Sequence, residues 1–204
     1  MSEVDVTTVQ IAGADGTTLE GDLLTPAEPT GTAVVCHPHP LYGGSRRDAV
    51  VSALSRGLVA AGRQVLRFDF RGAGGSAGTH GGGPAERDDL LAAVASLDTG
   101  LPLILAGYSF GADVALSVTV DNAEGWLAVA PPLGVFVPTE MVAGADPRRV
   151  RIVVGAHDEV ATPRRVELTV ADWRATEVVT IGGADHFFAG RGGRLADLAA
   201  DFAT

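Results

Sequence analysis

Short apolar runs alternate along the chain with segments in which apolar residues recur at helical spacing. The runs, which lie between Thr32 and Gly183, are TAVVC, QVLRFDF, LPLILAG, GWLAVA, VRIVVGA and TEVVTIGG. Runs of this length that are apolar almost throughout are typical of strands buried on both faces of a sheet. The helical segments cover residues 46–61, 86–97, 110–120, 163–173 and 194–202. Strands that alternate with helices predict an α/β fold, with a mostly parallel sheet and helices on both faces.

The N-terminal stretch from Val4 to Leu24 has a different pattern, in which polar and apolar residues alternate. It predicts an antiparallel hairpin of half-buried strands around the turn at residues 13–16. No internal repeat or linker of domain length follows, and the glycine-rich stretch from Gly72 to Pro84 predicts a loop. A chain of 204 residues has the size of one domain, so we expect residues 1–204 to form a single domain.

Composition narrows the class of protein. Apolar residues make up 46% of the chain and charged residues 20%, which is too hydrophobic for intrinsic disorder. No stretch approaches the roughly 18 consecutive apolar residues of a membrane span. The opening residues MSEVDVTTVQ lack the basic start and apolar centre of a signal peptide. We therefore expect a soluble protein of the cytoplasm.

Charge and residue usage exclude several chemistries. The chain has 25 acidic and 15 basic residues, a net charge of −10, and contains no lysine. Without lysine, neither a Schiff base nor the lysine of a phosphate-binding loop is available. A strongly acidic chain is also a poor partner for nucleic acid or an anionic membrane. The single cysteine, Cys36, excludes an internal disulfide or a multi-cysteine metal site, and we expect it to be a small buried hydrophobe.

The carboxyl ends of the predicted strands carry the residues suited to chemistry. In an open parallel sheet, ligands bind outside these ends. The candidate segments are Cys36–Pro40, Asp69–Gly72, Gly107–Gly111, His157–Glu159 and Asp185–Phe188.

The pattern Gly-x-Ser-x-Gly occurs twice, around Ser76 and around Ser109. In a nucleophile elbow, a strand runs into the serine and a helix runs out of it, so that the helix N-terminus faces the developing charge. Ser109 follows LPLILA and precedes FGADVALSVTV, and Gly107 and Gly111 leave room for a tight crossing. Ser76 lies in the glycine-rich loop, where no helix begins. We therefore predict Ser109 as the nucleophile and Ser76 as a loop residue.

A serine hydroxyl needs a neighbouring base, and the base needs an acid that fixes its tautomer. His186 follows the last predicted strand and Asp158 follows the strand before it, which gives the chain order serine, acid, histidine. Glu159 is the near competitor for the acid, whereas Asp185 adjoins His186 and would struggle to reach back to its ring. We predict a triad of Ser109, Asp158 and His186, with a solvated loop histidine as the alternative for His186.

A developing oxyanion needs two backbone N–H donors. Phe110, which follows the nucleophile, is the first predicted donor. The second is expected from the loop after TAVVC, where Pro38 and Pro40 have no N–H. In that loop we expect the N–H of His39 to be the second donor, with the N–H of Leu41 as the next candidate.

Aromatic residues flank the same strand ends. Tyr42, Tyr108 and Phe187 are the predicted substrate-binding residues, with Phe110 and Phe188 beside them. Packing alone is an equally open interpretation for each of these side chains.

The segment of residues 132–148 is where a lid would enter such a fold, and it is too short for a helical cap. We therefore expect an open site, or one shielded by a second copy of the chain, so a homo-oligomer is left open. The apolar segment Leu133–Val137, together with Met141 and Val142, is expected at the rim of the site or in an interface.

Several motifs together resemble the small, cap-less bacterial α/β-hydrolases that are commonly described as predicted hydrolases or dienelactone-hydrolase-like esterases. They are CHPHPLYGG at 36–44, FDFRGxGxS at 68–76, GYSFG at 107–111, APP at 130–132 and ADHFF at 184–188. The resemblance covers nearly the whole chain and implies a mostly parallel sheet flanked by helices, with Ser109, Asp158 and His186 as the triad. Dienelactone hydrolases proper have a cysteine nucleophile, so dienelactone is not implied as the substrate.

These residues predict a serine hydrolase, similar to carboxylesterases and thioesterases, that cleaves a small ester or thioester through an acyl-enzyme without a cofactor or metal. A serine peptidase-like amidase and a catalytically weak binding protein of the same fold are the alternatives. The loose dinucleotide pattern at 72–77 opens no helix, and the pair His37 and His39 lacks further metal ligands. We expect Arg71 to pair with a carboxylate or hold the glycine-rich loop, with a surface arginine as the alternative.

Overall fold

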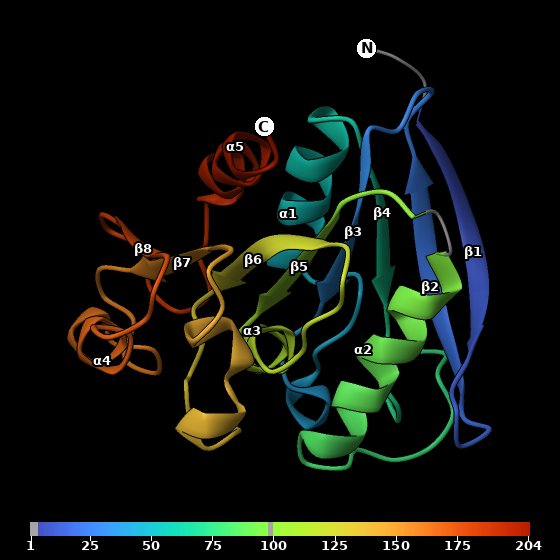
Figure 1. Cartoon of the computed structure of the whole chain (residues 1–204), viewed down its shortest axis with the longest axis horizontal. Coiled ribbons are helices and arrows are strands. Elements are labelled where there is room, and N and C mark those ends of the chain that lie inside the picture. The colour runs from blue at the N-terminus through green and yellow to red at the C-terminus, as the bar shows by residue number, and fades with distance from the viewer. Residues whose placement is uncertain (1–3, 98–99) are drawn as a thin grey trace.

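The computed structural model describes residues 4–97 and 100–204. Within them, eight strands form one sheet in the order β1-β2-β4-β3-β5-β6-β7-β8 (Figure 1). The pairs β1–β2 and β2–β4 are antiparallel, and the other neighbours are parallel, which confirms the predicted hairpin and the mostly parallel sheet. The strands are β1 Asp5–Ala12, β2 Thr18–Thr25, β3 Gly31–Cys36, β4 Arg63–Phe68, β5 Leu103–Tyr108, β6 Ala123–Val129, β7 Arg149–Gly155 and β8 Thr176–Ile181.

Helices cover both faces of this sheet (Figure 1). Helices α1 (Ala49–Ala60) and α5 (Gly192–Phe202) pack together on one face, and α2 (Pro84–Leu97) and α3 (Phe110–Leu116) pack together on the other. Helix α4 (Pro163–Thr169) lies at the β8 end of the sheet. Short 3-10 turns are η1 Pro40–Tyr42, η2 Pro138–Glu140 and η3 Val142–Gly144. Among the described residues, no helix combines the length and the apolar character needed to cross a bilayer.

Helix α3 is shorter than predicted and ends at Leu116 rather than at residue 120. The N–H groups of Ser117 and Val118 bond to carbonyls three residues back, which tightens the last turn. The carbonyl of Val118 then accepts the indole N–H of Trp126 at 2.9 Å. This bond to β6 draws the chain away from the helix axis.

The bounds of α1 and α4 also differ from those predicted. Helix α1 begins at Ala49 rather than at residue 46, because the carboxylate of Asp48 caps the N–H groups of the first turn. Helix α4 ends at Thr169 rather than at residue 173. Trp173 leaves the helix so that its ring packs against Gly144, where an added Cβ would lie 2.7 Å from the ring.

Burial follows the position of each strand in the sheet. The central strands β3 and β5 are buried at every position, and Phe68, Phe70 and Trp126 are among the large side chains that fill the core. The prediction of burial on both faces is wrong for β8, in which Ile181 alone is buried. Strand β1 is more exposed than the predicted half-buried strand, with Ile11 as its one buried residue. Both are edge strands, with a neighbour on one side.

A cluster of charges ties the hairpin to the ends of the central strands. The side chain of Arg46 is 3% exposed and donates hydrogen bonds to Glu20, Asp22 and Asp69. Arg67 donates to the same Asp22 at 3.1 Å. Because Arg46 lies in the loop between β3 and α1 and Asp69 directly follows β4, the cluster holds these two segments together.

Replacing Arg46 by methionine should lower the free energy of unfolding by about 3–5 kcal/mol, because three carboxylates would lose their shared cation. The neighbouring Arg47 is exposed, and no carboxylate in the described part of the chain lies within ion-pair distance of it. Arg47→Met should therefore change that free energy by less than about 0.5 kcal/mol. Urea unfolding followed by circular dichroism measures both variants, and equal effects would contradict a stabilising role for the cluster.

Candidate active site

Ser109 forms the whole turn between strand β5 and helix α3. Strand β5 ends at Tyr108, and α3 begins at Phe110. The backbone of Ser109 has φ 52° and ψ −121°, a region that residues other than glycine rarely adopt. Its N–H donates to the carbonyl of Val129 at 2.8 Å, which anchors the turn to β6. The chain thus passes from strand to helix within one strained residue.

The structure brings Ser109, His186 and Asp158 into one line of hydrogen bonds. The Nδ1 atom of His186 lies 2.9 Å from Oδ2 of Asp158, and Nε2 lies 3.1 Å from Oγ of Ser109. An ionised carboxylate can only accept, so the His186 proton is on Nδ1. The Nε2 atom then accepts the hydrogen bond from the Ser109 hydroxyl. The loop that carries His186 is held by Tyr108, whose hydroxyl donates to the His186 carbonyl at 2.9 Å.

The environment of Asp158 keeps its carboxylate ionised. Burial on its own would raise the pKa of Asp158. The hydrogen bond from His186 and those from the N–H groups of Ala161 and Val160 outweigh burial and lower this pKa below its ordinary value. The two N–H donors lie 2.7 and 2.8 Å from Oδ1, so both carboxylate oxygens are engaged.

The neighbouring acids point elsewhere. The Asp185 carboxylate accepts the N–H of Phe187 at 3.0 Å, and the side chain of Glu159 is exposed. Asp158 is therefore the acid that faces His186.

The second Gly-x-Ser-x-Gly copy has a structural setting. Ser76 lies in the loop between β4 and α2, where its hydroxyl donates to the Asp69 carbonyl at 2.6 Å and accepts the Glu20 N–H at 2.9 Å. Both hydrogen-bonding directions of the hydroxyl are thus in use. In the same loop Arg71 pairs with the buried Asp89 at 2.7 Å, in agreement with the expectation that it meets a carboxylate.

The loop after β3 packs directly on the first turn of α3. An added Cβ on Gly111 would lie 2.4 Å from the carbonyl oxygen of His37. The rings of His39 and Phe110 are in contact, tilted by 54° with their centres 5.0 Å apart. The N–H of Phe110 belongs to the first helical turn, so it has no acceptor within the helix. The loop and the helix N-terminus therefore border the same space beside Ser109.

Three residues of this loop, His39, Leu41 and Tyr42, have an N–H group that could serve as the second donor. In turn η1 two of these N–H groups already have acceptors. The N–H of Leu41 donates to Nδ1 of His39 at 3.3 Å, and that of Tyr42 donates to the His39 carbonyl at 3.1 Å. Within the described residues, the N–H of His39 has no acceptor. This arrangement favours His39 over Leu41 as the second donor.

The ring of His37 is hydrogen-bonded to the backbone on both sides and so has a structural role in the loop. It is fully buried, its Nδ1–H donates to the Pro38 carbonyl at 2.6 Å, and its Nε2 accepts the N–H of Phe70 at 2.9 Å. Both ring nitrogens are therefore occupied, which removes His37 from the pair considered as metal ligands. Cys36, the preceding residue, is buried, and burial raises the pKa of its thiol, as expected for a small hydrophobe.

A cleft of about 570 Å³ opens over Ser109 and His186. The predicted substrate-binding residues Tyr42, Tyr108 and Phe187 all line it. Tyr108 is 3% exposed and forms the floor, whereas Tyr42 and Phe187 are 87% and 72% exposed and form the rim. Phe188 is buried in the core and does not line the cleft. The lining consists of His39, Tyr42, Tyr108, Ser109, Phe110, Pro132, Gly134, Val135, Val160, Arg165, His186 and Phe187.

The segment of residues 132–148 forms one wall of the cleft and no cap. The buried carboxylate of Asp113, in the first turn of α3, accepts the N–H groups of Leu133, Gly134 and Val135 at 2.9–3.0 Å. This fixes the segment beside the elbow. The expectation that Met141 lies at the rim is wrong, because its side chain is 5% exposed and packs in the core.

Three residues of this region were not found by the sequence patterns. The patterns predict a helix over residues 110–120 but no role for Asp113 within it, and they single out neither Val160 nor Arg165. Their positions depend on how the segments after β6 and β7 fold back over the elbow. Contacts between segments so far apart in the sequence leave no local pattern of residues from which they could be predicted.

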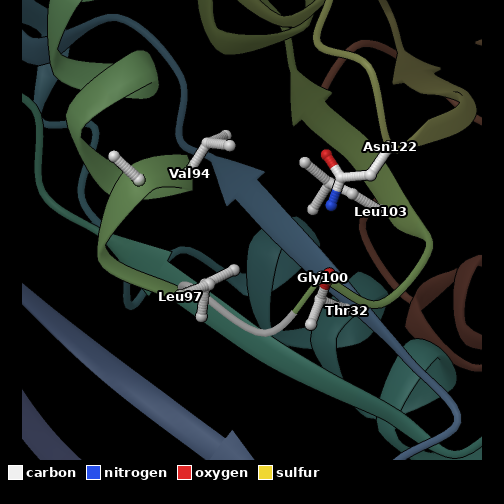
Figure 2. A pocket seen from close by; sticks show the side chains of 7 residues that line it. Thr32, Val94, Leu97, Gly100, Leu103 and Asn122 are labelled. Carbon is white, nitrogen blue, oxygen red and sulfur yellow. The ribbon is translucent and has the colours of Figure 1, made fainter.

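A second cavity, of about 260 Å³, lies at the opposite end of the strands, where β3 and β5 begin (Figure 2). Its labelled lining residues come from the starts of these strands, from α2 and from the segments that precede β5 and β6. They are Thr32, Val94, Leu97, Gly100, Leu103 and Asn122. None of these described residues is an acid or a base, and the cavity is separate from the cleft over Ser109.

A family model described as serine aminopeptidase, S33, matches residues 28–153 of the chain. The chain belongs to this family. The match runs from before β3 into β7 and includes Ser109, whereas Asp158 and His186 follow its end. The matched segment therefore holds only Ser109 of the three hydrogen-bonded residues, and the line from Ser109 to Asp158 is an observation of the structure alone.

Similar proteins agree on the fold. A structure described as an α/β serine hydrolase homologue from Coxiella burnetii is 31% identical, with TM-score 0.88, and covers 100% of this chain and 99% of its own. A Xanthomonas campestris α/β serine hydrolase described as without lid is 30% identical, with TM-score 0.82, covering 97% and 93%. An uncharacterized protein of Rickettsia prowazekii is 33% identical over 169 residues, which is 76% of this chain and 71% of that protein. The hydrolase thus has the α/β-hydrolase fold and no cap domain, as the resemblance implied.

The buried ring of His37 should remain neutral far below the usual titration range of histidine. Burial lowers its pKa from 6.5 to about 4, although the hydrogen bond to Pro38 opposes the shift. The unfolded chain would take up this proton near pH 6.5, so the contribution of His37 to stability is complete above pH 6.5 and is lost as the pH falls towards 4. An NMR titration of the ring carbons, assigned with His37→Gln, should give a midpoint below about pH 5. A midpoint near 6.5 would contradict it.

Proposed function

We propose that this hydrolase cleaves a small ester or thioester with Ser109 as nucleophile, His186 as base and Asp158 as the acid that orients the base. The observation that carries the proposal is the line of hydrogen bonds from Asp158 through His186 to Ser109, at the base of an open cleft. This is the arrangement that converts a weak hydroxyl into a nucleophile.

In the first step, the Oγ atom of Ser109 bonds to the substrate carbonyl carbon and its proton passes to Nε2 of His186. The oxyanion is stabilised by the N–H groups of Phe110 and His39. The bond to the leaving oxygen or sulfur then breaks, and that atom takes the proton from His186. Water then enters, bonds to the acyl carbon and gives one proton to Nε2 of His186. The bond between the acyl carbon and Oγ of Ser109 breaks, and Oγ takes that proton from His186, which releases a carboxylic acid and restores both residues. Atoms and charge balance without a cofactor.

The cleft favours an acyl substrate over an aminoacyl amide, although the family description names an aminopeptidase. An aminopeptidase has to hold a protonated α-amino group, which a carboxylate does best. No aspartate or glutamate is among the residues that line the cleft, and Arg165 would repel a cation there. An ester or thioester substrate is consistent with this lining.

A panel of p-nitrophenyl esters of increasing chain length, an acyl-CoA and an aminoacyl p-nitroanilide tests the proposal. We expect the short esters or the thioester to give the highest kcat/KM and the aminoacyl anilide the lowest, because of the lining of the cleft. The anilide being hydrolysed fastest would favour the amidase instead.

Three variants test the roles of the residues on the best substrate. Ser109→Ala should reduce kcat by a factor on the order of 10⁴ or more, and Asp158→Asn by roughly 10²–10⁴, because the base then loses its orientation. Glu159→Gln changes the exposed neighbour of Asp158 and should leave kcat within about twofold. Full activity of Ser109→Ala would refute the proposal.

A further inference from the structure

Among the described residues that line the cleft over Ser109, Arg165 is the one aspartate, glutamate, lysine or arginine. It lies in α4, the helix that follows the loop of Asp158, and its side chain is exposed. The rest of the lining is aromatic, aliphatic or, at Ser109 and the two histidines, already assigned to the reaction or to the oxyanion loop. A cation at this place therefore bears on which substrates the cleft accepts.

The guanidinium of Arg165 has no anionic partner among the residues that the structure describes. Its one hydrogen bond within the described residues goes from Nη2 to the carbonyl of Pro132. No carboxylate in residues 4–97 and 100–204 lies within ion-pair distance of it, whereas other arginines, such as Arg46, Arg71 and Arg151, bind two or three carboxylates each. Most N–H groups of Arg165 are thus free to bind a ligand.

Asp113, a carboxylate on which the charge of Arg165 acts, is already satisfied by other groups. Its carboxylate accepts three backbone N–H groups from the segment after β6. It senses the charge of Arg165 at a distance but forms no ion pair with it. The positive charge of Arg165 therefore remains directed to the cleft.

The side chain is also held in place. The hydrogen bond from Nη2 to the Pro132 carbonyl anchors one edge of the guanidinium to the segment after β6, which forms a wall of the cleft. A planar guanidinium that is fixed on one edge presents its other edge to a ligand, and two parallel N–H groups match the two oxygens of a carboxylate.

We propose that Arg165 binds a carboxylate of the substrate, so that this hydrolase acts on esters or thioesters that carry a carboxylate a few bonds from the reacting carbonyl. The inference rests on the proposed function of Ser109. A chain with a net charge of −10 repels anions over most of its surface, so a selective site for one requires a local, unpaired cation. The size of the cleft, about 570 Å³, suits a short substrate such as a monoester of a dicarboxylic acid.

The test compares substrates that differ in charge and hardly in shape. On the acyl side, p-nitrophenyl hydrogen glutarate is compared with p-nitrophenyl 4-carbamoylbutanoate, in which a neutral amide replaces the carboxylate. On the leaving-group side, 4-carboxyphenyl butyrate is compared with 4-carbamoylphenyl butyrate. Spontaneous hydrolysis of each ester is subtracted, because a neighbouring carboxylate accelerates it. The measured quantity is the ratio of kcat/KM for the anionic ester to that for its neutral match.

For at least one of the two pairs, we expect the wild-type ratio to be about ten or more, as for a charge-assisted, bidentate hydrogen bond. Arg165→Gln should bring this ratio to about one, and Arg165→Lys should retain part of it as a point charge. The matched control is Arg164→Gln, which removes the same charge from the adjacent, exposed position of α4 and should leave the ratio and the basal activity unchanged.

A wild-type ratio near or below one in both pairs, or a ratio that Arg165→Gln leaves unchanged, would overturn the role of Arg165 while neutral esters remain substrates of Ser109. Equal loss of the ratio in Arg164→Gln would show a general charge effect and would also overturn it. Failure to hydrolyse any of the four esters would instead refute the proposed ester hydrolysis, and the inference with it. The two failures are therefore distinguishable.

Discussion

A Cβ atom on Gly107 would lie 2.2 Å from the carbonyl oxygen of Gly111, and one on Gly111 would lie 2.4 Å from that of His37. On both sides of Ser109, backbone atoms therefore occupy the space that a side chain at residue 107 or 111 would need. This contact lets β5 pass into α3 within a single residue and brings the loop after β3 against the helix N-terminus. The position of the hydroxyl, the two candidate oxyanion donors and the space between them all depend on it. The strained φ of Ser109 persists because the packing around it leaves the chain no other path.

Buried charged side chains hold the remaining loops to this turn. Arg46 joins the loop after β3 to the end of β4, Arg71 fixes the glycine-rich loop on α2 through Asp89, and Asp113 binds the backbone of the segment after β6. Each of these groups is removed from water and satisfied inside the protein, which is tolerable because the geometry supplies every partner. Arg165, like Arg47, has no carboxylate partner among the described residues, but unlike Arg47 it lines the cleft over Ser109.

The order of strands and helices and the residues at the strand ends could be predicted from sequence. The spacing of apolar residues within a segment distinguishes strands from helices, and the order of the segments can be seen directly along the chain. Ser109 could be distinguished from Ser76 in the same way, since only Ser109 directly follows a strand and directly precedes a helix. The ends of α3 and α4 could not be predicted, because Trp126 and Trp173 make contacts there with distant segments. Arg165 could not be singled out among fifteen arginines either, because its place in the cleft is a property of the folded chain.

The proposed chemistry depends most directly on Ser109 being the activated hydroxyl. Treating the folded protein with a fluorophosphonate probe and mapping the adduct by mass spectrometry measures this without assuming a substrate. We expect one adduct, on Ser109, none on Ser76, and no labelling of Ser109→Ala. A label on another residue, or one that persists in Ser109→Ala, would contradict it.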